Sequence, residues 1–357
     1  MISYRVTAAS QLPEQAWSRW AEIQSGQPEL DSPFFSPELA RLTSLVRDDV
    51  EVATIHDGEE LAGFFPFQRT RENTAQAITG RLSEFHGAVY RPGIEWSPDA
   101  LLRACGLRAW HFDHLPVNQA AFSTHIWGTT TSPCMDLSQG YGAWREQVRQ
   151  QGSTVTQVER KARKLEREVG PLRFEYRTPS AEVFAALVEW KTGQHERTSV
   201  LPIFRTPWVV NLLEALRTHE SPGFIAPLSA LYAGDQLLAV HLGLQSRNAL
   251  HIWFPSYDPE FDKYSPGLVL LLNLAEEAAE RGINRIDFGR GEERYKQSLK
   301  TGDVLIAEGK VSRHSVGTAV HAAWYRTKRR IRESRWRQQL ELPLTLTRRL
   351  RQRAAFR

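Results

Sequence analysis

The fold is decided by the stretch Tyr257-Asp-Pro-Glu-Phe-Asp-Lys-Tyr-Ser-Pro-Gly-Leu268, which opens a helix between two strands. Ser265 is a good N-cap, Pro266 suits the first helical position, and Gly267 leaves the next amide unscreened by any Cβ. Apolar residues then recur at a helical period, and Arg281-Gly282 is a good C-terminal stop. Because a helix N-terminus with bare amides attracts anions, we predict a phosphate or pyrophosphate site here.

Two strands are expected before this helix. Leu237–Leu244 alternates, with larger aliphatic residues on one face and small residues around His241 on the other, so the second face is expected to leave room for a ligand. Ala249–Phe254 puts His251 and Trp253 on one face, and a hairpin register that pairs 241 with 251 would set the two histidines side by side. Each histidine also has a plain interpretation as a buried residue with satisfied hydrogen bonds.

A short strand and a charged loop are expected after the helix. Asn284–Phe288 reads as a buried strand, and Gly289–Lys296 as a flexible loop crowded with ionisable groups. In a strand–helix–strand layout, ligands lodge beyond the C-terminal ends of the strands. The polar side chains at that end are Asp287, Arg290, Glu292, Tyr295 and Lys296. We predict that they line a site, with a structural ion-pair network as the alternative.

Landmarks in the first half of the chain suggest a duplication. A hairpin is expected around Asp57-Gly58 in the first half and around Gly234-Asp235 in the second. Aligning Leu61 with Leu238 gives an offset of 177, and aligning Phe112 with Phe288 gives 176. Two motifs at nearly the same offset favour tandem domains, although short hairpins also coincide by chance.

The expected join lies in residues 129–152. Thr129–Pro133 breaks regular structure before one long polar helical segment, Tyr141 to Val169. We therefore predict a mixed α/β (α+β) fold in which each domain is a twisted mixed sheet flanked by helices. The predicted divisions are an N-terminal domain over 1–135, a C-terminal domain over 136–315 and a basic helical tail over 316–357.

Composition and charge exclude several classes of protein. With 357 residues, 41% of them apolar, the chain can fill two ordinary cores. Two cysteines and no secretory segment predict a cytoplasmic protein, and the apolar run Leu268–Leu272 is far too short to cross a membrane. From Arg326 to Arg357, twelve Lys or Arg accompany two Glu, a net charge of +10 that leaves −6 for the remaining residues. Such a tail suits an anionic membrane surface or RNA, with a solvated extension as the plain alternative.

The residues quoted above resemble those of a known family. The run 257–268, the helix, and Ile286-Asp-Phe-Gly-Arg-Gly-Glu-Glu-Arg-Tyr-Lys296 are similar to the GNAT superfamily of acetyltransferases, in its CelD or BioF2-like group associated with cellulose and exopolysaccharide biosynthesis. Fem-type peptidyltransferases, which are tandem GNAT domains, are more distantly similar. The specific resemblance covers about residues 150–300. It implies two tandem GNAT-like domains, the first of them degenerate.

The resemblance also implies roles for residues. The strands Ala249–Phe254 and Ile283–Phe288 would splay apart around acetyl-CoA or another acyl-CoA, with pyrophosphate at the helix start. Cofactor binding is then assigned to His251, Trp253, Ser265, Pro266, Gly267 and Leu268. Tyr295 would be the acid that protonates the leaving thiolate, and His241, or a water held by it, the base; Asp287 and Arg290 complete the catalytic set. The acceptor, an amine or a sugar, is assigned to Lys191, Tyr257, Glu292 and Lys296.

Other readings remain open from the sequence. The loop before Leu268 has fewer glycines than GNAT enzymes usually carry, so a Fem-like transferase that uses aminoacyl-tRNA is the alternative, with the tail and the basic segment Arg160–Arg167 contacting phosphates. A non-catalytic GNAT-like binding module is a further alternative. The cluster His111-Phe-Asp-His114 has no recognised metal spacing, and no metal is predicted. The oligomeric state is left open. A membrane-attached tail would place the protein at the inner surface of the membrane.

Overall fold

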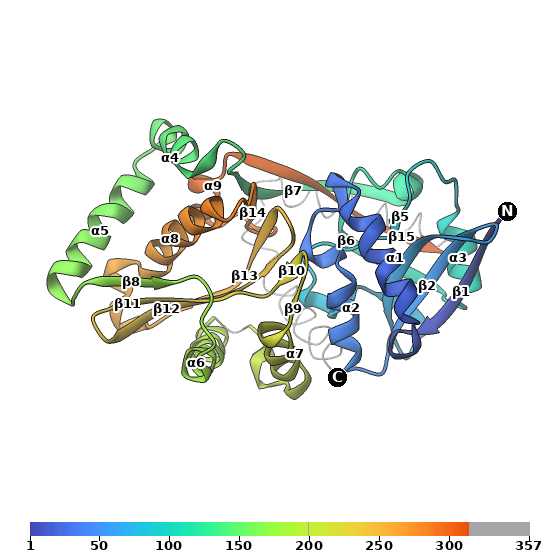
Figure 1. Cartoon of the computed structure of the whole chain (residues 1–357), viewed down its shortest axis with the longest axis horizontal. Helices are drawn as coiled ribbons and strands as arrows, with labels where there is room; N and C mark the ends of the chain where they lie inside the picture. The colour runs from blue at the N-terminus through green and yellow to red at the C-terminus, as the bar shows by residue number, and fades with distance from the viewer. Residues whose placement is uncertain (199, 314–357) are drawn as a thin grey trace, which may run out of the picture. The chain divides into compact units, whose positions relative to one another are not determined.

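The chain folds as a mixed α/β protein, as predicted (Figure 1). The computed structural model describes residues 1–198 and 200–313, so the predicted tail lies outside the described residues. Contacts divide these residues into two compact units. Unit 1 contains residues 1–30, 34–130 and 305–313, and unit 2 contains 31–33 and 131–304. The predicted domain limits at 135/136 and 315/316 stay predictions.

Unit 1 is a mixed sheet with an aromatic core. Its strands follow the order β1 (Ile2–Ala8), β2 (Val50–Asp57), β3 (Glu60–Arg69), β4 (Thr74–Gln76), β6 (Ala109–Pro116) and β15 (Gly302–Ser312), and β5 (Val89–Tyr90) pairs with β3. The helices of this unit are α1 (Glu14–Ser25), α2 (Pro37–Ser44) and α3 (Pro98–Ala104). Phe65, Trp110 and Phe122 are fully or almost fully buried, and they pack as tilted or edge-on rings.

Unit 2 contains the segment quoted at the outset. Its sheet has the order β7 (Ile126–Asp136), β14 (Arg285–Asp287), β13 (Ala249–Tyr257), β12 (Gln236–Gln245), β10 (Phe224–Ile225) and β9 (Glu220–Ser221). In addition β11 (Leu228–Ala233) pairs with β12, and β8 (Leu172–Glu175) pairs with β11. All of these contacts are antiparallel except that between β13 and β14, which is parallel.

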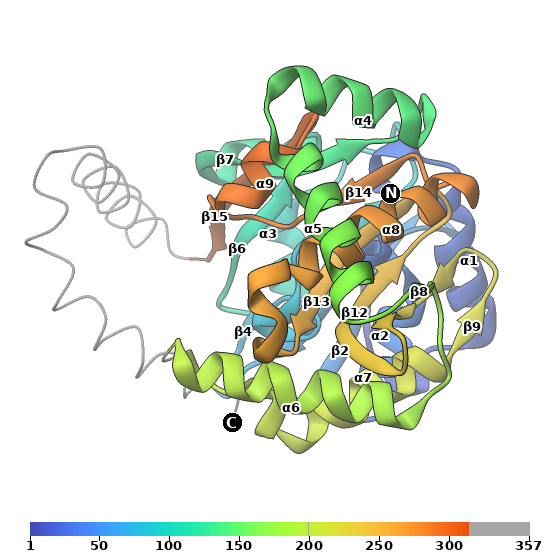
Figure 2. The ribbon, with the colours of Figure 1, turned by 90° about the vertical axis from the view of Figure 1, so that its left-hand side faces the viewer.

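Helices cover both faces of this sheet (Figures 1 and 2). On one face lie α4 (Gly140–Gln151), α5 (Thr154–Glu168) and α8 (Pro266–Glu280), and on the other lie α6 (Ala181–Arg197) and α7 (Pro207–Thr218). The short helix α9 (Arg294–Leu299) packs against α4 and α5. The prediction of one helix over 141–169 is wrong, because the chain breaks at Gly152-Ser153 into α4 and α5.

The helix α8 is apolar on most of its circumference because it lies between the sheet and α4 and α5. Leu270, Leu271, Leu272 and Leu274 are all buried. Each fully buried leucine contributes about 1.5–3 kcal/mol relative to exposure, so this helix anchors unit 2. Its predicted limits are confirmed, since it begins at Pro266 and its chain turns at Gly282 with φ +82°.

Two details of the strands differ from the predictions. Residues 238–244 of β12 are buried on both faces, because α8 covers the face that was expected to leave room for a ligand: Ala239 of that face packs in one core with Leu270 and Leu274. The predicted pairing of 241 with 251 is also wrong: His241 is paired with Pro255, and His251 with Leu244. The Ser246 amide donates to the Ala249 carbonyl at 2.8 Å, so the hairpin turns later than expected, and the next strand runs on to Tyr257.

Candidate active site

The strands β13 and β14 pair only at their beginnings. The pairs are Ala249 with Arg285, Leu250 with Ile286 and His251 with Asp287. Beyond His251, β13 continues for six residues to Tyr257, whereas β14 ends at Asp287 and the chain turns at Gly289 with φ +71°. The edge of β13 beyond His251 therefore has no pairing with β14, which is the divergence expected between these two strands.

The helix that connects the two strands starts next to a lysine. Ser265 stands at the N-cap position but has φ +52°, and its side chain makes no cap hydrogen bond, so the predicted capping role is wrong. The left-handed backbone turns its hydroxyl toward α5, where Ser265 Oγ accepts a hydrogen bond from Lys161 Nζ at 2.7 Å. The partial positive charge of the helix N-terminus is thus joined by an ammonium group. Pro266 is buried, and Gly267 and Leu268 are half-buried in the first turn.

The last paired residues, His251 and Asp287, are both fully buried. Asp287 Oδ1 accepts from Arg285 Nε at 3.0 Å, and Arg285 also donates to the Asp31 carbonyl at 2.7 Å. Burial raises the pKa of Asp287, and the guanidinium of Arg285 opposes that rise. The predicted catalytic carboxylate therefore lies in an ion pair at the point where the strands part.

Two buried lysines lie just beyond this point. Lys191 extends from α6 and donates to the Pro255 carbonyl at 2.7 Å and to Gln194 Oε1 at 2.9 Å. Burial, together with the charge of Lys296, lowers the pKa of Lys191 to about 8. Lys296 donates to the carbonyls of Gly289 and Arg290, both at 3.3 Å. Each lysine therefore bonds backbone that lies past the last paired residue of its neighbouring strand.

His241 lies on β12, on the same face as Ala239, which packs in one core with α8. Its side chain is fully buried, and burial plus the charge of Lys191 lower its pKa to about 3, so the imidazole is neutral at ordinary pH. Neither ring nitrogen has a hydrogen-bond partner within the described residues. The ring folds against Gly243, where a Cβ would lie 2.6 Å from His241 Cε1 and 3.0 Å from the His251 carbonyl oxygen. A glycine at 243 is what allows this close approach.

The other predicted site residues lie on β13, in the loop after β14 and on α9. Tyr295 on α9 packs edge-on against Phe288 with ring centroids 6.0 Å apart, just past β14. Trp253 is buried on β13, and Tyr257 at its end is 37% exposed with its hydroxyl donating to Asp262 at 3.0 Å. Arg290 is half-buried and Glu292 is exposed, both in the loop between β14 and α9.

Sequence reasoning missed two residues of this region. Lys161 lies in the basic segment Arg160–Arg167, which was considered only for contacts with tRNA phosphates, and its bond to Ser265 distinguishes it. His195 lies one turn after Lys191 on α6, and burial and the charge of Lys191 lower its pKa to about 4. A basic residue next to an unpaired helix N-terminus is a signal of anion binding, but it is visible only after folding.

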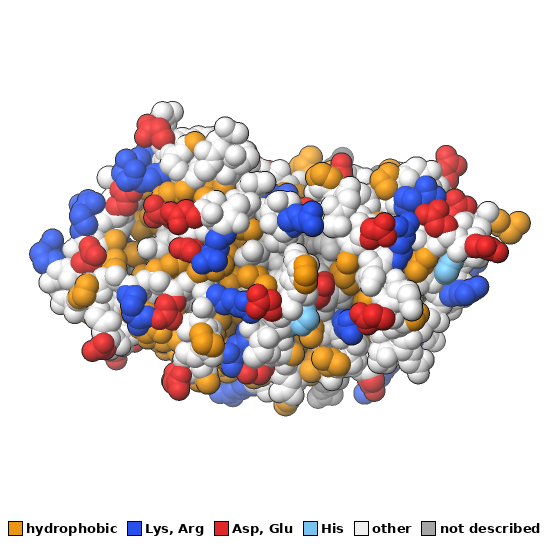
Figure 3. Space-filling model, in the orientation of Figure 1, with side chains coloured by type: hydrophobic (Ala, Val, Ile, Leu, Met, Phe, Trp, Pro, Cys, Tyr) orange, Lys and Arg blue, Asp and Glu red, His pale blue; other side chains and the backbone are white. Residues whose placement is uncertain are grey.

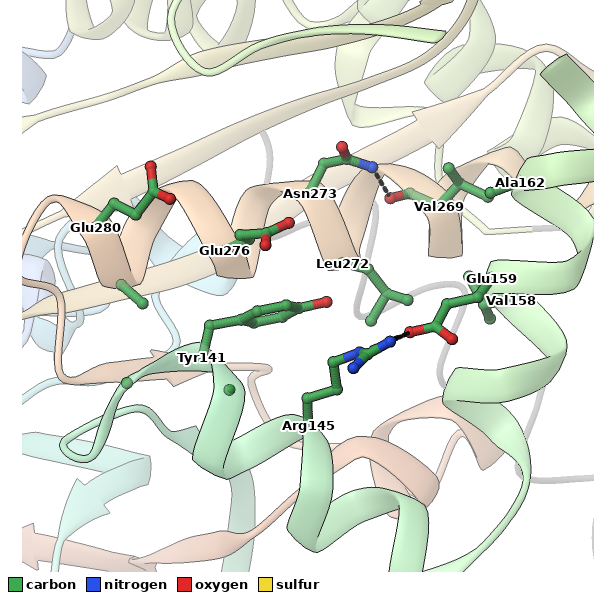
Figure 4. Close-up of a pocket in the computed structure, with 13 residues that line it drawn as sticks. Tyr141, Arg145, Val158, Glu159, Ala162, Val269, Leu272, Asn273, Glu276 and Glu280 are labelled. Carbon is green, nitrogen blue, oxygen red and sulfur yellow. Dashed lines mark hydrogen bonds and ion pairs between the residues drawn. The ribbon is translucent and has the colours of Figure 1, made fainter.

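A separate groove of about 740 Å³ lies among α4, α5 and α8. Figure 3 shows hydrophobic side chains gathered in this hollow, with charged ones around it. In Figure 4, Arg145 points to Glu159, and Asn273 donates to the Val269 carbonyl of its own helix. None of the predicted site residues lines this groove. We therefore place the candidate site at the strand divergence.

The described residues contain neither a candidate metal site nor a membrane-spanning helix. No group of three or more His, Cys, Asp or Glu is placed to hold a metal ion in residues 1–198 and 200–313. Within the same part of the chain, no helix has the length and apolar character needed to cross a membrane.

Comparison with protein families gives one match. Residues 152–297 match the model of the acetyltransferase (GNAT) domain. This segment includes every residue predicted for the site, from Lys191 to Lys296. No curated protein matches the chain.

Solved structures show the same fold at low identity. FemX has a TM-score of 0.55 at 11% identity, with 86% of this chain and 96% of FemX covered. The C-terminal domain of a putative lysylphosphatidylglycerol synthetase from Agrobacterium fabrum has a TM-score of 0.53 at 12% identity, covering 86% of this chain and 94% of that one. L-PGS from Bacillus licheniformis has a TM-score of 0.51 at 11% identity, covering 87% of this chain and 96% of that one. These likenesses concern the fold alone.

Proposed function

We propose, from the GNAT-fold acetyltransferase domain in residues 152–297, that the protein transfers an acyl group from acetyl-CoA or another acyl-CoA to the amine of an acceptor. The single observation that carries this proposal is the divergence of β13 from β14 after His251 and Asp287. An unpaired strand edge offers backbone amides and carbonyls to an extended ligand, and the pantetheine arm of CoA has amides that can pair with it.

The start of α8 supports a phosphate-bearing donor. The Ser265 side chain caps none of its first amides, and Lys161 adds a positive charge from α5. Pyrophosphate would gain from both the helix dipole and the ammonium group. A donor with its phosphates at Ser265–Leu268 would direct its thioester along β13 toward the buried lysines.

The residues past the divergence supply groups for acyl transfer. The acceptor amine attacks the thioester carbon and loses a proton, and the carbon–sulfur bond breaks as the thiolate leaves. In our proposal His241, neutral above a pKa of about 3, or a water held by it accepts the proton. Tyr295 then returns a proton to the thiolate. Lys191 or Lys296 would oppose the negative charge that develops on the carbonyl oxygen.

The test is calorimetric titration of the full chain with acetyl-CoA and longer acyl-CoAs. Gly267→Asp places a carboxylate at the proposed phosphate site, and since an acid in the first helical turn favours the helix, the variant should fold. Gly267→Ala is the matched control, because a Cβ there meets nothing nearer than Tyr257 Cδ1 at 3.4 Å. We expect binding by the wild type and the alanine variant, and a loss of about 100-fold in the aspartate variant.

The absence of acyl-CoA binding by the wild type would reject this donor. The second candidate is then a Fem-like transferase, which the shared fold with FemX favours. Binding of aminoacyl-tRNA that weakens steeply with salt would support that candidate. If neither donor binds, the remaining candidate is a non-catalytic GNAT-like binding module.

The biological setting belongs to the same proposal. The resemblance to the CelD or BioF2-like group points to polysaccharide or cell-envelope biosynthesis, with a sugar amine as acceptor. We further propose that the protein works in the cytoplasm, with the basic segment 326–357 at the inner membrane surface. Sedimentation with anionic but not neutral vesicles is the measurement that checks this setting.

A further inference from the structure

The pairing of β12 with β13 shifts in register level with the point where β13 leaves β14. Leu242 pairs with Phe254 and Leu244 with His251, so the single residue Gly243 lies opposite two residues of β13. His251 is also the last residue of β13 that pairs with β14. An extra residue of this kind bends its strand and re-aims nearby side chains. The shift therefore lies at the beginning of the unpaired edge of β13.

The space around Gly243, and not its backbone, requires a glycine at this position. Gly243 does not have the positive φ that favours glycine, so other residues could adopt its conformation. A Cβ here would lie 2.6 Å from His241 Cε1, 3.0 Å from the His251 carbonyl oxygen and 3.1 Å from Leu250 Cδ1. The first of these distances is far below van der Waals contact. The imidazole of His241 therefore occupies the space that a side chain at 243 would take.

The ring of His241 lies level with the start of the divergence. The backbone of His241 pairs with Pro255, which follows His251 by four residues on the unpaired part of β13. The ring reaches from there over Gly243, because its Cε1 and the His251 carbonyl oxygen both lie within 3.0 Å of the position of a Cβ at 243. An extended donor that pairs with the free edge of β13 must end at this level, since β14 occupies the edge from His251 backwards.

Packing, and not hydrogen bonding, holds this ring in place. The His241 side chain is fully buried, and neither of its nitrogens has a hydrogen-bond partner within residues 1–198 and 200–313. A functional histidine is usually oriented by a hydrogen bond to its second nitrogen. Because His241 has no such bond in the described residues, its orientation depends on the shape of the space over Gly243.

We propose that Gly243 is a positioning residue for acyl transfer, which acts through His241 by leaving the space that holds the imidazole level with the start of the divergence. This inference rests on the proposed function, in which His241 or a water held by it accepts the proton of the acceptor amine. A side chain at 243 would displace the ring, and a displacement of about 1 Å costs on the order of 100-fold in rate. Donor binding at the start of α8 would be unaffected.

The experiment is a double-mutant cycle on the full chain, with acetyl-CoA as donor, glucosamine as acceptor and release of the CoA thiol as the signal. We expect Gly243→Ala to lower kcat on the order of 100-fold, with the KM for acetyl-CoA changed by less than about twofold. In a His241→Ala background the same substitution should change kcat by less than about twofold, because the nearest remaining atom is 3.0 Å from the new Cβ. Gly142→Ala is the matched control, since its Cβ would meet nothing within 4 Å, and it should leave kcat unchanged.

An equal loss of kcat from Gly243→Ala in both backgrounds overturns the inference and leaves the proposed function standing, because Gly243 would then act through the fold alone. No thiol release by the wild type rejects the proposed function, and this inference with it. If a His241→Ala variant does not fold, NMR provides the second measurement. The ¹H–¹³C signal of His241 Cε1, identified by its absence from His241→Gln, should shift in Gly243→Ala, while that of His86 in unit 1 stays in place. An unchanged His241 signal overturns the inference.

Discussion

The two units share a plan but differ at the helix that joins their parallel strands. In unit 1, β4 and β6 are parallel and α3 lies between them in the chain; in unit 2, β13 and β14 are parallel and α8 lies between them. Both helices begin with Ser-Pro, at Ser97 and at Ser265. Ser97 Oγ accepts from the Ala100 amide at 3.2 Å, whereas Ser265 is left-handed and bonds Lys161.

Buried histidines show the same contrast. In unit 1, His86 Nε2 accepts from the backbone amides of Asp113 and His114 at 3.1 and 3.3 Å. In unit 2, His241 has no such partner in the described residues. The comparison teaches that backbone amides of unit 1 satisfy one ring nitrogen of its buried histidine, while unit 2 leaves both nitrogens of His241 available to a ligand.

The largest expected effect concerns the residue past β14. Tyr295→Phe removes the proposed acid, so kcat should fall on the order of 10³-fold, about 4 kcal/mol, with little change in KM. Tyr90→Phe in unit 1 is the control and should leave kcat unchanged. Steady-state kinetics with the best acyl-CoA measures both. A similar loss of kcat in both variants would contradict the assignment of catalysis to unit 2 alone.

A smaller effect is expected in stability against pH. Burial, together with the charge of Lys296, lowers the pKa of Lys191 to about 8 in the folded chain. Between pH 8 and 10.5 the unfolded chain binds more protons, so the free energy of unfolding should rise with pH by at most about 3 kcal/mol. Lys191→Met should remove that rise. Urea unfolding at several pH values measures it, and an unchanged slope in the variant would contradict the burial of a charged lysine.

The next effect in size concerns the affinity for the acyl-CoA donor, which should depend on Lys161. Lys161→Met removes the ammonium at the start of α8, and acetyl-CoA should bind about 10-fold more weakly. Lys164→Met, one turn further along α5, should bind normally. Titration calorimetry compares the two, and equal affinities would show that only the helix N-terminus holds the donor.

The smallest effect sharpens the comparison of the two helix starts. Ser97→Ala should lower the free energy of unfolding by about 1 kcal/mol because it removes a helix cap. Ser265→Ala should lower the free energy of unfolding by only a few tenths of a kcal/mol, since this side chain caps nothing. Denaturant unfolding of both variants provides the measurement. If both variants lose the same free energy of unfolding, the two serines play the same structural role.

The sequence predicted those features that depend on neighbouring residues. The mixed α/β class and the limits of α8, from Pro266 to the turn at Gly282, follow from capping residues, periodicity and glycine. The same reasoning could have predicted the helix break at Gly152-Ser153. It was missed because the residues on either side follow one continuous polar pattern.

Only the tertiary structure decided which distant groups meet. Strand register depends on the turn and on a shift between Leu242 and Leu244, so the pairing of His241 was not readable in advance. Lys161 reaches Ser265 across 104 residues of sequence, and Lys191 reaches Pro255 across 64. Local patterns determine where helices and strands begin and end. The packing of those elements determines which charges are buried together, and the chemistry of this site depends on that packing.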